Sequence, residues 1–117
     1  MKQVVKSWGN EFLIKKKDTK TRKILHVLKG KSIHLQHHEK KREWMRVMDG
    51  IGYAVRMKKD GKQGEMIALE EGDSIFIEKG VIHKIWAHNN SDLWIFEKSE
   101  DGDDKDVIHH EIFECDE

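Results

Sequence analysis

The amino-acid sequence predicts an all-β fold. Apolar and polar residues alternate in short runs along most of the chain, which is the pattern of strands with one buried face. Turn-forming residues separate these runs at intervals of roughly eight to twelve residues, which is typical of a β-sandwich or barrel. No segment carries a helical apolar stripe with a cap at each end. Because 117 residues can bury a single core without disulfide support, we expect residues 1–117 to form one domain.

The individual runs define the expected strands. In chain order they are 24–28, 33–37, 44–48, 53–57, 75–77, 82–86, 94–96 and 107–113. Asp49-Gly50 and Asp60-Gly61 suit hairpin turns, because glycine adopts the positive φ that such turns need. The acidic stretch 99–106 is predicted to be an exposed loop before the last strand. We expect roughly nine to ten short strands in all.

Charge and cysteine content exclude several classes of function. The 22 Lys and Arg residues balance the 22 Asp and Glu residues, which argues against nucleic acid or an anionic membrane as a partner. The single cysteine, Cys115, excludes an internal disulfide and a cysteine-based zinc site. No apolar stretch approaches the ~20 residues of a membrane span, and the first ten residues lack a signal-peptide core. We therefore expect a cytoplasmic protein.

A two-part pattern of glycines and metal-ligand side chains is the strongest functional signal. It comprises Gly30, Gln36, His38, Glu43 and Gly50, followed by Gly72, Gly80 and His83. Two imidazoles, a carboxylate and an amide form a nitrogen and oxygen ligand set that suits a divalent transition metal. Because side chains alternate along a strand, Gln36 and His38 share one face. A closed β-fold can bring His83 beside them.

This pattern resembles the motif of the cupin family, small jelly-roll β-barrels that usually hold one metal ion. Glutamine at the first ligand position is typical of the phosphomannose isomerase branch, and the segments 32–38, 42–44 and 47–50 are similar to that branch as well. The resemblance implies a single-domain cupin. It also implies that Gln36, His38, Glu43 and His83 bind one divalent metal, and zinc, manganese, iron and nickel are each compatible with this ligand set.

The resemblance further implies a sugar or sugar-phosphate isomerase or epimerase, in which the metal acts as a Lewis acid on the sugar oxygens. His34 is the candidate acid or base, since imidazole titrates near neutrality. Trp86 is a candidate for stacking on a sugar ring. The candidate phosphate-binding residues are Arg42, Arg46, Arg56, Lys58 and Lys84. A homodimer is expected from the resemblance alone.

Two other functions stay open. The tail differs from the isomerase pattern, because His109 occupies the place of an arginine and the closing arginine is absent. One alternative is a non-catalytic cupin that binds or senses a small carbohydrate. The other is a metal-dependent dioxygenase, since such ligands with open coordination positions also suit iron and O₂.

Overall fold

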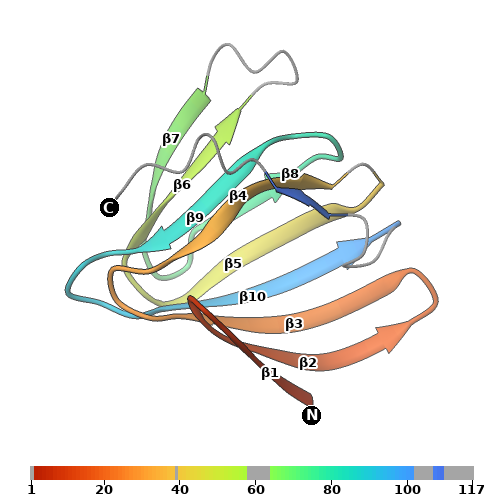
Figure 1. The fold of residues 1–117 in the computed structure, drawn as a ribbon, viewed down its shortest axis with the longest axis horizontal. Helices are drawn as coiled ribbons and strands as arrows, with labels where there is room; N and C mark the ends of the chain where they lie inside the picture. Colours follow the sequence, from red (N-terminus) through yellow and green to blue (C-terminus); the bar gives the residue numbers. More distant parts are fainter. Residues whose placement is uncertain (1, 39, 58–63, 102–106, 110–117) are drawn as a thin grey trace.

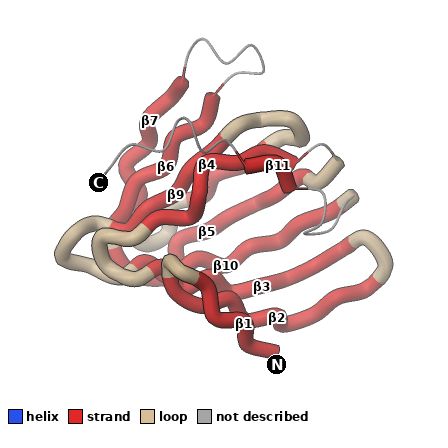
Figure 2. The backbone as a smooth tube through the Cα atoms, viewed as in Figure 1, coloured by secondary structure: helices blue, strands red, loops and turns tan. Residues whose placement is uncertain are grey.

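The computed structural model describes residues 2–38, 40–57, 64–101 and 107–109, with the backbone alone for 34–38 and 107–109. Those residues form strands and connecting turns without a helix, which confirms the all-β prediction (Figure 2). The strands are β1 (Lys2–Lys6), β2 (Gly9–Lys17), β3 (Lys20–Val27), β4 (Ser32–His38), β5 (Arg42–Gly50), β6 (Gly52–Met57), β7 (Gly64–Leu69), β8 (Ser74–Ile77), β9 (His83–Ala87), β10 (Leu93–Glu100) and β11 (Val107–His109). Within the described ranges no helix is long and apolar enough to cross a membrane.

Two antiparallel sheets face each other across one core (Figure 1). Sheet A has the order β1-β2-β3-β10-β5-β8, and sheet B has the order β11-β4-β9-β6-β7. Strands that are far apart in the sequence are neighbours in both sheets, as β3 and β5 on either side of β10 show. This arrangement places Glu43 on β5 and His83 on β9 in opposite sheets, whereas Gln36 and His38 lie on β4 beside β9.

Three observed strands were not predicted, and the reason is the same for each. β1 and β7 are edge strands with mainly exposed side chains, and the second half of β2 is exposed as well. Alternation marks a strand only where one face is buried, so these segments carry little of it. The other predicted runs are confirmed where the structure describes them, although the end of the run 107–113 lies outside the described residues.

Two predictions about connections were wrong. Ser99 and Glu100 belong to β10 and Ser99 is buried, so the loop predicted from residue 99 begins later. Asp49-Gly50 does not close a hairpin, because β5 and β6 belong to different sheets. Gly50 does have the expected positive φ of 96°, and a Cβ there would lie 1.9 Å from the backbone oxygen of Asp92. The turn at Asp60-Gly61 lies outside the described residues.

The interior has two halves that differ in chemistry. Strands β3, β5, β9 and β10 each contribute apolar side chains at one end and polar ones at the other. We call the first set the apolar half: Leu25, Val27, Met45, Val47, Ile85, Ala87, Leu93 and Ile95. We call the second set the polar half: Thr21, Lys23, Lys41, Glu43, His83, Glu97 and Ser99. Since both halves are buried, the fold holds charged groups out of water at one end of the interior.

Candidate functional site

Glu43 and His83 meet between the two sheets. The distance from Glu43 Oε1 to His83 Nε2 is 3.4 Å, and each side chain is only 2% exposed. Strand alternation explains the approach: Glu43 lies on the same face of β5 as the buried Met45, and His83 on the same face of β9 as the buried Ile85. Two residues forty positions apart in the sequence pattern are thus in contact.

The ring orientation of His83 is set by the backbone. His83 Nδ1 lies 2.9 Å from the carbonyl oxygen of Val81, and because a carbonyl only accepts, Nδ1 carries the hydrogen. In the neutral ring Nε2 is then the nitrogen with the lone pair, and it faces the carboxylate of Glu43. Two acceptors at this distance are compatible with either a protonated imidazole or a cation that both groups bind. In a metal-binding histidine, the ring nitrogen that does not bind the metal usually donates a hydrogen bond to a carboxylate, a backbone carbonyl or water.

The carboxyl group of Glu43 is ionised. Burial alone would raise its pKa, but the favourable interaction with the imidazole of His83 outweighs burial. Lys41 adds a further positive charge, with its Nζ 3.9 Å from Glu43 Oε2. The pKa of Glu43 is therefore held well below its usual range. A deprotonated carboxylate and a neutral imidazole nitrogen are the forms in which these side chains bind metals.

A second carboxyl group lies beside Glu43. Burial, and then the negative charge of Glu43, raise the pKa of Glu97 well above its ordinary value, so Glu97 holds a proton and hydrogen-bonds to Glu43. Lys23 is opposite Glu97 in the β3–β10 register, and its Nζ lies 2.7 Å from Glu11 Oε1. The site thus continues along the inner face of sheet A from Glu43 through Glu97 to the Lys23–Glu11 pair.

Sequence reasoning missed Glu97 and Lys23, although a signal was present. Glu97 lies on the same face of β10 as Leu93 and Ile95, and Lys23 lies on the same face of β3 as Leu25. A charged residue in phase with buried apolar residues is a candidate for the interior. That phase is the signal that could have identified both groups.

The other predicted ligands lie on β4. Gln36 is directly opposite His83 in the β4–β9 register, and His38 follows two residues later on the same strand. The side chains of His34, Gln36 and His38 lie outside the described part of the structure. Among the side chains that are described, no group of three or more His, Cys, Asp or Glu forms a metal site. The structure therefore brings Glu43 and His83 together and sets the backbone of Gln36 beside them.

One of the candidate basic residues shares the inner face with His83. Arg56 is opposite His83 in the β6–β9 register. Its Nη1 donates a hydrogen bond of 2.7 Å to the backbone oxygen of Phe76, and its Nη2 pairs with Glu65. Since Phe76 belongs to sheet A, Arg56 links the edges of the two sheets.

The remaining candidates are not brought to this site. Arg42 and Arg46 alternate with Glu43 along β5 and therefore lie on the outer face of sheet A. Lys84 and Trp86 alternate with His83 in the same way. Lys84 is buried on that face of β9, and its Nζ lies 5.9 Å from the Trp86 ring centroid. In each case the candidate is the sequence neighbour of an inward-facing residue, and neighbouring residues in a strand point to opposite faces. Lys58 lies outside the described residues.

A pocket of about 410 Å³ adjoins the site at the edges of the two sheets. Its lining residues are Arg56, Met57, Gly64, Glu65, Phe76, Glu78 and Val81. Val81 also supplies the carbonyl that orients His83, and Arg56 is the register neighbour of His83. The pocket therefore lies next to the residues that orient and flank His83, although neither Glu43 nor His83 lines it.

Comparison with known proteins identifies the family and the fold. The sequence profile described as "Mannose-6-phosphate isomerase C-terminal" matches residues 1–111. None of the curated proteins is a significant match in sequence.

Several solved structures resemble the fold of this chain at low sequence identity. The capsular polysaccharide assembling protein CapF from Staphylococcus aureus superposes with a TM-score of 0.80 at 17% identity, over 92% of this chain and 33% of CapF. Oxalate decarboxylase from Lactobacillus farciminis gives 0.75 at 17% identity, over 92% and 33% of the two chains. The cupin protein BF4112 from Bacteroides fragilis gives 0.61 at 20% identity, over 74% and 70%. The chain spans about a third of CapF, and these likenesses confirm the cupin fold.

Proposed function

The chain belongs to the mannose-6-phosphate isomerase C-terminal family of cupins, and on that premise we propose that it is a metal-dependent isomerase of a sugar phosphate. The observation that carries the proposal is the buried contact between Glu43 and His83, 3.4 Å apart and close to the pocket that Arg56 and Val81 line. A bound divalent metal would supply a Lewis acid for the oxygens on the two carbons that exchange oxidation state.

The metal would be held by Glu43 and His83, with Gln36 and His38 completing the set from β4. The donor chemistry supports this assignment, because Glu43 is ionised and the Nδ1 hydrogen of His83 is occupied by Val81. Four protein ligands leave one or two coordination positions for substrate. Zinc, manganese, iron and nickel all accept such ligands.

Arg56 is the residue that we assign to the phosphate. A guanidinium group matches the geometry of phosphate oxygens, and Arg56 lies beside His83 at the wall of the pocket. Its present partners are Glu65, which is 59% exposed, and a backbone oxygen. Replacement of the Glu65 carboxylate by a substrate phosphate at Arg56 should cost little free energy, because an exposed ion pair is weak.

Isomerisation also needs a group that moves a proton between neighbouring carbons. His34 remains our candidate for that step, since an imidazole side chain can both accept and donate a proton. Glu97 has a different role in this proposal. Because it keeps its proton, it limits the negative charge around Glu43 and hydrogen-bonds to the ligand.

The test is turnover of mannose 6-phosphate in deuterated buffer, followed by proton NMR, with zinc, manganese, iron or nickel added in turn. We expect deuterium to enter the substrate at the exchanging carbon with at least one metal. Arg56→Ala should lower kcat/KM by about 10- to 100-fold, the loss of a charged hydrogen bond. Arg46→Ala is the matched control, because Arg46 lies on the outer face of the sheet.

Two results would contradict the proposal. One is metal uptake without isomerisation or deuterium exchange for any aldose or ketose phosphate. The other is consumption of oxygen together with a substrate, which would indicate a dioxygenase.

A further inference from the structure

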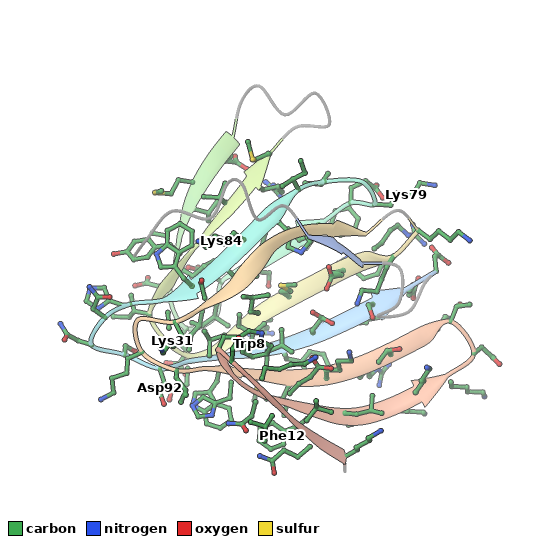
Figure 3. The ribbon with its side chains drawn as sticks, viewed as in Figure 1. Trp8, Phe12, Lys31, Lys79, Lys84 and Asp92 are labelled. Carbon is green, nitrogen blue, oxygen red and sulfur yellow. The ribbon has the colours of Figure 1, made fainter. Side chains whose placement is uncertain are left out.

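The outer face of sheet A, on the opposite side from Glu43 and the core, carries aromatic and basic side chains together. In Figure 3, Phe12 of this face lies outside the sheet, whereas Trp8 lies toward the core. We call the part of the face on the neighbouring strands β3, β10, β5 and β8 the outer patch. It consists of two rows of register neighbours: Arg22, Lys98, Trp44 and Phe76 in one row, and Ile24, Phe96, Arg46 and Ser74 in the other. All of these residues are at least partly exposed.

A groove of about 460 Å³ lies over the patch on β10, β5 and β8. Most residues of the patch line it: Trp44, Phe76, Phe96, Arg46, Lys98 and Ser74. The ring centroids of Trp44 and Phe76 are 5.1 Å apart and the ring planes are inclined by 39°, so the two rings form one apolar surface. A groove of this volume, with a few polar groups beside an apolar surface, is typical of a small-ligand site.

The patch carries more positive than negative charge. Its two arginines, Arg22 and Arg46, are exposed, and within the described part of the chain neither forms an ion pair. The acidic residues at the end of β10 already have basic partners: Glu100 pairs with Arg42 and Lys98, and Asp101 pairs with Arg42. A ligand of the patch should therefore be an anion, because no carboxylate balances the two arginines.

The basic residues continue beyond the groove. Arg22 is opposite Lys98 on one side and opposite Lys15 of β2 on the other. Neighbouring strands are about 4.8 Å apart, so these three cations form a row that leads away from Trp44 across the sheet. A ligand longer than the groove would therefore meet the aromatic rings with one part and the cations with the next.

A chain of sugars with acidic groups combines the properties that the patch requires. The C–H face of a pyranose ring is apolar and packs on an aromatic side chain. A carboxylate, sulfate or phosphate on the sugar would pair with Arg46, because a guanidinium group donates two parallel hydrogen bonds to such an anion. A nucleic acid also combines rings with negative charge, but its affinity depends on a basic surplus, and this chain has no net charge.

We propose that the outer patch binds an acidic oligosaccharide, with Trp44 as the stacking surface and Arg46 as the anion-binding residue. The patch and the contact of Glu43 with His83 lie on opposite faces of sheet A, so the proposal does not rest on the isomerase activity. An oligosaccharide bound there would not contact Glu43 or His83, because the sheet lies between them.

Isothermal titration with hexagalacturonate and with a heparin hexasaccharide tests the proposal, and the two probes distinguish a carboxylate from a sulfate as the acidic group. We expect saturable binding of at least one of them, with an affinity that falls as salt is added because exposed charges are screened. Maltohexaose, a neutral chain of the same length, should bind about 10-fold more weakly or less, since it lacks the charged hydrogen bond.

Single variants test the two assigned residues. Trp44→Ala and Arg46→Ala should each raise the dissociation constant for the acidic probe by about 10-fold or more, through loss of the stacking surface and of the charged hydrogen bond. Tyr53→Ala and Lys6→Ala are the matched controls and should bind as the wild type does. Tyr53 is a partly exposed ring opposite Trp86 on the outer face of sheet B, and Lys6 is an exposed cation on β1.

Several results would overturn the proposal. They are no binding of either acidic probe, binding of maltohexaose as tight as that of the acidic probe, and wild-type affinity in Arg46→Ala. Tighter binding of a short oligothymidylate than of either acidic saccharide would overturn it as well and indicate a nucleic-acid site. Thermal unfolding of each variant separates loss of binding from loss of the fold, and Arg46→Ala, at an exposed residue, should melt as the wild type does. Because Arg46→Ala should also retain the turnover of mannose 6-phosphate, failure of this proposal is distinguishable from failure of the isomerase.

Discussion

The two halves of the interior show how one set of strands serves two purposes. On β10, Leu93 and Ile95 at one end are followed by Glu97 and Ser99 at the other, and all four are buried. The apolar half excludes water and gains free energy from burial. The polar half loses free energy, because buried charges give up their hydration. The fold therefore derives its stability from one end of its strands and tolerates a costly, preorganised site at the other.

This difference predicts that the two halves respond to different perturbations. Removal of apolar volume should affect stability throughout the pH range. Changes in the polar half should affect pH dependence and metal binding more than the stability at a fixed pH. The following variants are ordered from the largest expected change in the free energy of unfolding to the smallest.

Leu93→Ala should lower the free energy of unfolding by about 2–5 kcal/mol, because Leu93 is fully buried in the apolar half and its loss leaves a cavity. Urea unfolding measures the effect. Leu28→Ala is a matched control, since Leu28 is 38% exposed and its truncation should change stability by about 0.5 kcal/mol or less. Equal losses for the two leucines would contradict the division of the interior.

Glu97→Gln should stabilise the metal-free protein at neutral pH. The folded pKa of Glu97 is raised above its ordinary value of 4.5, so the wild type loses stability as the pH rises from that value toward the folded pKa. The glutamine has no proton to lose, and its advantage should grow by up to about 1.4 kcal/mol per pH unit. Thermal melting between pH 4 and pH 8 measures the difference. A constant difference over that range would show that Glu97 is not protonated in the fold.

Asp92→Asn should have the smallest effect and the opposite pH dependence. Asp92 Oδ2 lies 2.8 Å from His26 Nε2, and this hydrogen bond lowers the pKa of Asp92 below 3.8. The ionised form therefore stabilises the fold above that pH, and the contribution disappears as the pH falls through the folded pKa. Because the pair is partly exposed, we expect a loss of about 0.5 kcal/mol at pH 7.

Much of the fold could be predicted from the sequence. The missed strands and the wrong hairpin have different physical causes. Alternation of apolar and polar residues reveals a strand and its inner face only where one face of the strand is buried. The edge strands β1 and β7 lack a buried face and were missed. Hairpins were assumed where glycine allows positive φ, but Gly50 instead turns the chain from sheet A to sheet B.

The sequence predicted part of the candidate site. The contact of Glu43 with His83 follows from the two-part pattern, because each residue begins or lies near the start of a strand in facing sheets. Arg42 and Arg46 were chosen for their charge alone, although the inward phase of Glu43 places both on the outer face. The burial of Glu97 could have been predicted from its phase, but its raised pKa could not, since that pKa depends on a carboxylate more than fifty residues away.

Metal binding by the purified protein tests the central claim most directly. Isothermal titration with zinc and with manganese should show one site per chain in the wild type. His83→Ala and Glu43→Gln should each weaken that site by about 100-fold or more, while retaining the fold, because each removes a ligand. His26→Ala, at a histidine bonded to Asp92 on the outer face, should bind as the wild type does. A wild type that binds no divalent metal, or one whose affinity is unchanged in His83→Ala, would contradict the account.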